Sequence, residues 1–169
     1  MHEHILTLYL PLIISNILHM FVVKYDFLKS LKIPLSIKAF GKNKTYRGFV
    51  FVTLFNGIVL FICTKIFQID LTTNPFILGL ILGLTYILFE LPNSFLKRRL
   101  GIAPGEKSEK FKLFFIFLDR CDSAFGVSLV YSLLAQIEFS EFIMLFGLAF
   151  GLHFFFSFVL YRIGIKESL

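Results

Sequence analysis

Four consecutive residues, Asp119-Arg120-Cys121-Asp122, interrupt a stretch that is otherwise apolar enough to form a membrane helix. Charged side chains in hydrocarbon cost several kcal/mol, so they persist where they pair, bind an ion or line a polar cavity. Asp119 and Asp122 are three positions apart, so on a helix their carboxylates lie on one face about a turn apart. Arg120 is turned roughly 100° from Asp119. This pattern predicts a metal or phosphate site inside a membrane helix.

An ion pair is the alternative to a metal site. Asp119 and Asp122 could pair with Arg120 or with a cation on a neighbouring helix, but two carboxylates beside one arginine leave a negative charge uncompensated. We therefore expect the pair to bind a divalent cation. Carboxylate oxygens suit Mg²⁺, which completes its shell with water and substrate phosphates. Arg120 either contacts a phosphate or locks the two aspartates, and both roles stay open.

The composition indicates which elements must position these residues. Of 169 residues, 57% are hydrophobic, with 24 Phe and no Trp, whereas a soluble domain of this length needs more polar surface. We expect one all-α integral membrane domain over residues 1–169. Five stretches have the length and apolar character of transmembrane helices, namely 5–23, 48–67, 74–91, 112–137 and 141–161.

The charges of the connecting segments predict the orientation of these helices. Residues 24–47 contain seven Lys or Arg and residues 97–112 contain six, whereas the short connections 68–73 and 136–141 contain none. By the positive-inside rule, the basic loops 24–47 and 92–111 face the cytoplasm and the N-terminus lies outside. The C-terminal tail, which contains Arg162 and Lys166, is then cytoplasmic. This predicts a multi-pass protein of the cell membrane.

The first basic loop ends in a segment suited to binding phosphate. Residues 41–48 read Gly-Lys-Asn-Lys-Thr-Tyr-Arg-Gly, so three cations and a hydroxyl lie between two glycines. Backbone N–H groups and cations in such a segment can surround a phosphate chain. The spacing is not that of a Walker A loop. The candidate phosphate-binding residues here are Lys42, Lys44, Thr45 and Arg47.

The second basic segment, residues 90–102, places Glu90 at the end of the third predicted span and three cations, Lys97, Arg98 and Arg99, just beyond it. Topology and attraction to anionic lipid are the alternative reason for such cations. Ser94 either caps the basic segment or contacts a phosphate.

Helix geometry brings the two basic segments and the aspartate pair to one membrane face. At 1.5 Å per residue, Asp119 and Asp122 lie roughly 9 Å and 14 Å from a helix start near Leu113. That depth is just under the predicted cytoplasmic headgroups. A soluble polyphosphate and a lipid phosphate could both reach it.

Three motifs in this order resemble a known family. Ser-x-x-Lys-Arg at residues 94–98 and Asp-Arg-x-Asp at 119–122 resemble the signature of membrane cytidylyltransferases, the CDP-diacylglycerol synthases. The small size, the segment 41–48 and Lys-Arg-Arg-Leu-Gly-Ile at 97–102 look closer still to the CDP-archaeol synthase family. The resemblance covers roughly residues 40–126.

The resemblance implies that CTP and a lipid phosphate react, with Mg²⁺, to give a CDP-lipid and pyrophosphate. It implies that Asp119 and Asp122 hold the metal. Residues implied to contact phosphates are Lys42, Lys44, Thr45, Arg47, Ser94, Lys97, Arg98, Arg99 and Arg120. The family more often has an Asp where this chain has Glu90, so whether Glu90 binds or supports the metal stays open. The lipid is of the archaetidic or phosphatidic acid type, and its chains stay open. A cation transporter and a non-catalytic scaffold are the alternatives.

The remaining polar residues of the spans are expected to serve helix packing. Lone intramembrane residues such as His19, Asn56 and His153 are more often hydrogen-bonded between helices than used as ligands. Gly79 and Gly83 have the small-x-x-x-small spacing of close helix contacts. That contact is expected within one subunit or between the subunits of a homo-oligomer. No nucleic-acid partner is expected.

Overall fold

The computed structural model describes residues 2–106 and 111–163, and these residues fold into helices joined by short loops. The elements are α1 (His2–Lys24), the 3-10 turn η1 (Lys29–Leu31), α2 (Ile37–Phe40), α3 (Tyr46–Phe67), α4 (Pro75–Arg99), α5 (Lys112–Ala135) and α6 (Phe139–Arg162). The all-α prediction is confirmed. Residues 107–110 of the predicted second basic loop, and Lys166 of the tail, lie outside the described residues.

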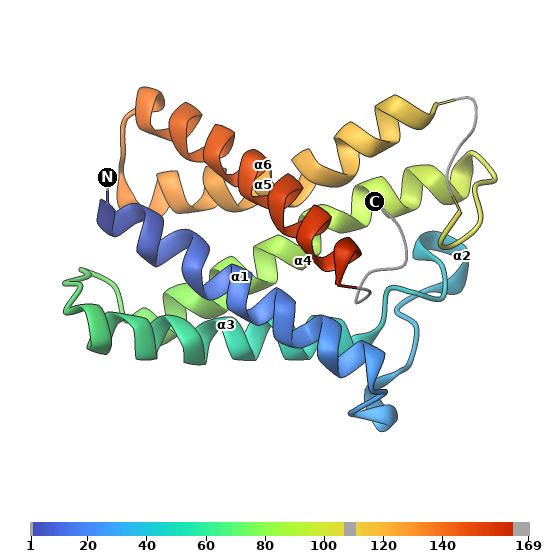
Figure 1. Ribbon diagram of the computed structural model, residues 1–169, viewed down its shortest axis with the longest axis horizontal. Helices are drawn as coiled ribbons and strands as arrows, with labels where there is room; N and C mark the ends of the chain where they lie inside the picture. The colour runs from blue at the N-terminus through green and yellow to red at the C-terminus, as the bar shows by residue number, and fades with distance from the viewer. Residues whose placement is uncertain (1, 107–110, 164–169) are drawn as a thin grey trace.

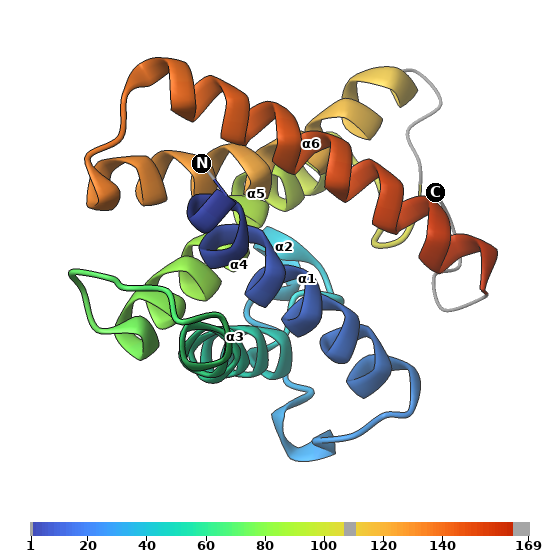
Figure 2. The ribbon, with the colours of Figure 1, turned by 60° about the vertical axis from the view of Figure 1, so that its left-hand side comes forward.

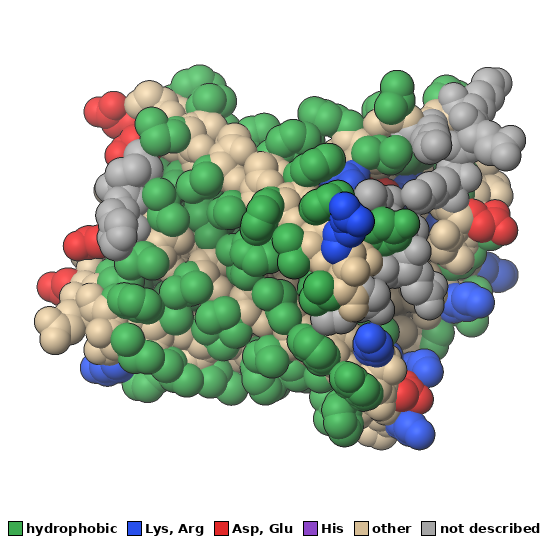
Figure 3. Space-filling view, in the orientation of Figure 1, with side chains coloured by type: hydrophobic (Ala, Val, Ile, Leu, Met, Phe, Trp, Pro, Cys, Tyr) green, Lys and Arg blue, Asp and Glu red, His purple; other side chains and the backbone are tan. Residues whose placement is uncertain are grey.

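The five long helices run alternately in opposite directions, so both basic loops lie at the same end of the molecule (Figure 1). The connections α3–α4 and α5–α6 lie at the other end. On the face shown in Figure 3, apolar side chains cover the middle, most of the visible Lys and Arg side chains lie near the basic loops, and acidic side chains lie at both ends. This arrangement is typical of a protein that crosses a bilayer.

Within the described residues, four helices, α1, α3, α4 and α6, are long and apolar enough to cross a membrane. The chain is therefore a multi-pass membrane protein. Helix α5 has 24 residues as well, but it carries the Asp-Arg-Cys-Asp cluster. A span count of five and the direction of the termini stay predictions.

Helix α4 differs most from its predicted span. The span was expected to end at Leu91, and the helix continues beyond it through Pro92 to Arg99. A proline inside a helix removes a hydrogen bond and costs about 3 kcal/mol. Tertiary contacts offset that cost, because the turns beyond Pro92 supply Asn93 and Lys97, which bind side chains of α5. The other long helices begin and end within three residues of prediction.

Helices α3 and α4 cross in close contact. A Cβ on Gly79 would lie 2.6 Å from the carbonyl oxygen of Asn56, and a Cβ on Gly83 would lie 2.9 Å from the Asn56 Cβ. The Asn56 amide also donates to the Gly79 carbonyl at 2.7 Å. The close packing predicted from the glycine spacing is confirmed, and it occurs within one subunit.

Helices α1 and α6 lie on opposite sides of the site. α1 packs mainly on α3, whereas α6 packs on α5. The turned view shows α6 and α5 on one side and α1 with α3 on the other (Figure 2). The predicted site residues of α4 and α5 lie where these two helices meet, and the others lie in the first basic loop and at the start of α3.

Candidate active site

Asp119 and Asp122 lie on the face of α5 that meets α4. The Nδ2 group of Asn93, on α4, donates to Oδ1 of Asp119 at 2.6 Å and to Oδ2 of Asp122 at 2.9 Å. The other oxygen of Asp122 accepts from the backbone N–H of Ser123 at 2.6 Å. A single uncharged amide therefore holds both carboxylates.

A lysine joins the same cluster from the next turn of α4. Lys97 forms an ion pair with Asp119, and its ammonium lies 5.4 Å from the centre of the Phe115 ring. The Lys97 side chain is 17% exposed and that of Asp119 is 45% exposed. One of the two aspartates therefore forms the ion pair considered as an alternative to a metal site, and its partner is Lys97 of the neighbouring helix α4 and not Arg120.

The first basic loop reaches the cluster through Lys44. The backbone N–H of Leu35 donates to the Lys44 carbonyl at 2.8 Å, which closes the loop into a narrow hairpin. Thr45 follows as the N-cap of α3, and its hydroxyl accepts from the Gly48 N–H at 3.5 Å. Lys44 is thereby fixed beside α4, where it forms an ion pair with Glu90.

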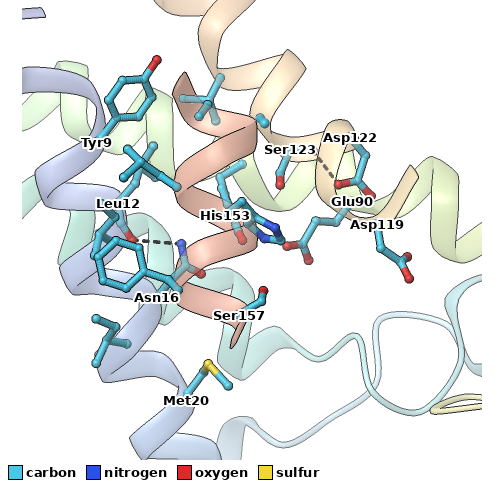
Figure 4. A pocket seen from close by; sticks show the side chains of 18 of the residues that line it. Tyr9, Leu12, Asn16, Met20, Glu90, Asp119, Asp122, Ser123, His153 and Ser157 are labelled. Atoms are coloured by element: carbon cyan, nitrogen blue, oxygen red, sulfur yellow. Dashed lines mark hydrogen bonds between the residues drawn. The ribbon is translucent and has the colours of Figure 1, made fainter. Parts of the chain in front are cut away.

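These residues open onto a cavity of about 390 Å³. Its polar end is lined by Lys44, Glu90, Asn93, Ser94, Asp119 and Asp122. Its apolar walls come from α1 and α6, and include Leu12, Ile13, Ile17, Met20, Leu152 and Phe156. Figure 4 shows the acidic side chains at one side of the cavity and α1 at the other.

A histidine of α6 also reaches the polar end. His153 was expected to serve helix packing, but it lines the cavity and points toward Glu90 (Figure 4). The two side chains interact electrostatically. Glu90 therefore has cationic or polar neighbours from the first loop and from the last helix.

Arg47 lies away from the aspartates. Its side chain is 4% exposed and donates to Asp26 Oδ1 at 2.9 Å and to the Phe27 carbonyl at 3.0 Å. Hydrogen bonds from Lys32 and then Arg47 hold the pKa of the Asp26 carboxyl below its ordinary value. In this structure Arg47 ties the start of the first basic loop to α3.

Arg120 faces α6 and contacts neither aspartate of its own motif. Its guanidinium donates to the Ile116 carbonyl at 2.8 Å and lies 5.0 Å from the centre of the Phe154 ring. The residue that holds the two aspartates is Asn93. Of the two roles predicted for Arg120, the locking role is therefore taken by another residue.

The other predicted phosphate contacts lie on α4 and in the first basic loop. Ser94 lies inside α4, so it does not cap a helix, and its side chain lines the cavity. Two guanidinium nitrogens of Arg98 are buried without a hydrogen-bond partner among the described residues. Lys42 is exposed. Arg99 is exposed as well, over the ring of Phe95 at 4.9 Å.

The donor set fits a hard divalent cation. In the described part of the chain, no three His, Cys, Asp or Glu side chains converge on a metal position. Mg²⁺ usually takes only one or two carboxylates and completes its shell with phosphates and water. Asp119 and Asp122, one turn apart and joined by one amide, match that requirement.

Asn93 and His153 were not among the predicted site residues. Asn93 binds aspartates 26 and 29 positions further along the chain. No spacing rule connects residues on different helices, and a lone histidine gives no signal at all. For Asn93, the useful signal was its position one residue before Ser94 in a motif already under consideration.

Comparisons with known proteins agree with the motif resemblance. Residues 5–169 match a family described as CarS-like CDP-archaeol synthase. Similar relatives are the CDP-archaeol synthases of Saccharolobus solfataricus (strain P2) and Saccharolobus islandicus (strain L.S.2.15). Each is 30% identical over 131 residues, which cover 77% of this chain and 72% of the relative. No solved structure matches the chain significantly.

Proposed function

The chain belongs to the CDP-archaeol synthase family of lipid-phosphate cytidylyltransferases, and we propose that it transfers the cytidylyl group of CTP to an archaetidic or phosphatidic acid type lipid. The products are a CDP-lipid and pyrophosphate, in phospholipid biosynthesis. The catalytic groups are Asp119, Asp122, Lys97 and Arg98.

The observation that carries this proposal is the two-sided character of the cavity. Its polar end combines carboxylates with Lys44, and its other walls are formed mainly by apolar side chains of α1 and α6. A lipid phosphate has the same two parts, a charged head and apolar chains. Apolar walls beside a charged cluster suit that substrate better than a soluble phosphate alone.

In the proposed reaction, an oxygen of the lipid phosphate attacks the α-phosphorus of CTP. A new P–O bond forms to the lipid, and the bond from the α-phosphorus to the bridging oxygen breaks, so pyrophosphate leaves with that electron pair. An ionised phosphate needs no general base. The protein's contribution is therefore to orient two anions and to neutralise their charge.

The cations near the aspartates have the chemistry for that neutralisation. Lys97 and Arg98 project from the last turns of α4, and Lys44 projects from the first basic loop. Two buried guanidinium nitrogens of Arg98 have no hydrogen-bond partner among the described residues, and we propose that a bound phosphate provides one. We assign Lys42, Thr45, Arg47, Ser94, Arg99 and Arg120 to supporting phosphate contacts, as the resemblance implies.

Asp119 and Asp122 would hold Mg²⁺. When bound, the ion supplies positive charge to the triphosphate and orients its oxygens. Glu90 is a candidate for supporting that site through Lys44 and His153. We further propose that the basic end faces the cytoplasm at the cell membrane, because CTP is a soluble nucleotide and positive loops favour that side.

Purified protein, CTP, Mg²⁺ and a panel of ether-linked and diacyl lipid phosphates test the proposal. Pyrophosphate release that requires both CTP and one lipid class would support it. Asp119→Asn and Asp122→Asn are expected to abolish this release while the proteins still insert and fold. Asp70→Asn, an exposed change at the opposite end, is the matched control and should leave release unchanged.

Two outcomes would reject the proposal. Full activity in either aspartate variant would remove the carboxylates from the reaction. A lack of pyrophosphate release with every lipid would favour the alternatives, a cation transporter or a non-catalytic scaffold.

A further inference from the structure

Asn93 is placed unusually for a polar residue of a membrane helix. It is 6% exposed, and its amide donates to both Asp119 and Asp122. Its Oδ1 atom is buried and has no hydrogen-bond partner among the described residues. The Asn93 side chain therefore donates to two carboxylates through Nδ2, while its Oδ1 atom accepts from no described residue.

The orientation of this amide follows from charge. A primary amide has two N–H donors on one side and an acceptor oxygen on the other. Only the donor side can face two carboxylates, because the oxygen would repel them. A buried acceptor without a partner destabilises the folded state. Packing alone would favour an apolar side chain at this position.

The two aspartates need such a donor. Their carboxylates lie on one face of α5, where they repel each other, and Lys97 draws Asp119 alone. Asn93 holds the two carboxylates together without adding charge. Each carboxylate has about four lone-pair positions, so both keep positions for a cation while they accept from Asn93.

We propose that Asn93 is a positioning residue for metal binding, which holds Asp119 and Asp122 in the arrangement in which they share one divalent cation. This inference rests on the metal site of the proposed function. Groups that hydrogen-bond to metal-binding carboxylates fix their orientation, and their loss typically weakens metal affinity about 10- to 100-fold.

Binding of Mn²⁺, measured by electron paramagnetic resonance on the purified full chain in detergent, tests the inference directly. Asn93→Ala is expected to weaken Mn²⁺ binding at least about tenfold while the protein still folds. Its melting temperature is measured alongside, because the change removes both the two hydrogen bonds to α5 and the buried Oδ1 atom. Asn93→Ser serves as a second variant if the alanine variant folds poorly, with weaker binding again expected.

Asn56→Ala is the matched control. Asn56 is also buried and donates through Nδ2 to a backbone carbonyl, and its Oδ1 has no hydrogen-bond partner in the part of the chain that the structure describes. It lies in the α3–α4 crossing and contacts neither aspartate. Its loss is expected to change the melting temperature but to leave Mn²⁺ affinity within about twofold of the wild type.

Catalysis provides a second readout. With Asn93→Ala, the Mg²⁺ concentration for half-maximal activity should rise at least about tenfold, and excess Mg²⁺ should restore most of the kcat. A purely structural defect would lower kcat at every Mg²⁺ concentration.

Three results would overturn the inference. They are unchanged Mn²⁺ affinity in both Asn93 variants, equal weakening in Asn56→Ala, and no Mn²⁺ binding by the wild type. Failure of the proposed reaction would look different. In that case the wild type would bind Mn²⁺ in an Asn93-dependent way but release no pyrophosphate with any lipid.

Discussion

Replacement of Gly126 by alanine is the change whose outcome the structure predicts most sharply. Gly126 lies one turn beyond Asp122 on α5, against Phe89 of α4, the residue before Glu90. A Cβ at this position would lie 2.1 Å from Cγ of Phe89 and 2.4 Å from its Cδ2. Because Cγ is the ring atom bonded to Cβ, rotation of the Phe89 ring about the Cβ–Cγ bond does not remove the clash.

The size of the effect follows from these distances. Ordinary contacts of this kind begin near 3.4 Å, so Phe89 or the helix must move by about 1.3 Å. Overpacking of this type destabilises by about 1–3 kcal/mol. A similar shift between α4 and α5 would lengthen the hydrogen bonds of Asn93, which measure 2.6 and 2.9 Å, beyond hydrogen-bonding range. A misplacement of about 1 Å in an active site can lower activity about 100-fold.

Thermal unfolding in detergent and pyrophosphate release at saturating CTP measure the two effects. Gly147→Ala is the control, because a Cβ there meets no described residue within 4 Å, and alanine in a helix interior gains up to about 1 kcal/mol over glycine. The melting temperature should therefore fall in Gly126→Ala and stay equal or rise in Gly147→Ala. Wild-type stability and activity in Gly126→Ala would refute the close contact of α4 and α5 that organises the site.

Three further changes test individual contacts. Asp26→Asn should lower the melting temperature at neutral pH, because a depressed pKa means that the ionised carboxyl stabilises the fold. This contribution is complete above the ordinary pKa of 3.8 and is lost as the pH falls further. A difference in melting temperature that is the same at every pH would contradict the prediction. Arg120→Met should lower stability by about 1 kcal/mol through loss of the ring contact and raise the KM for CTP through loss of the proposed phosphate contact, whereas an unchanged KM would remove Arg120 from the phosphate site. Lys44→Met and Glu90→Gln should be non-additive in unfolding experiments by about 1 kcal/mol, and simple additivity would argue against their ion pair.

The course of the helices was largely predictable from the sequence. Hydropathy and the distribution of Lys and Arg are properties of short stretches, and they located the long helices and the basic loops between them. What hydropathy did not indicate is that α4 continues past Leu91, where the predicted span ends, through Pro92 to Arg99. Contacts with α5, formed 26 positions later in the chain, keep that helix intact.

The candidate site was predictable only where its residues share a helix. The spacing of Asp119 and Asp122 placed both carboxylates on one face, and that placement agrees with the structure. Their partners were not predictable, because nothing local to α5 says which face of α4 it meets. Arg120 shows the same limit, since it is adjacent to Asp119 in sequence but faces Phe154 of α6.

The sequence by itself determined that this is a helical membrane protein with basic loops and a pair of carboxylates on one helix face. Those features depend on composition and on the 3.6-residue period of a helix. Only the tertiary structure decided that Asn93 joins the carboxylates, that Lys97 and Lys44 pair with acids of the site, and that α1 and α6 wall the cavity. These contacts depend on how helices pack, and packing is set by side-chain shapes on several helices at once.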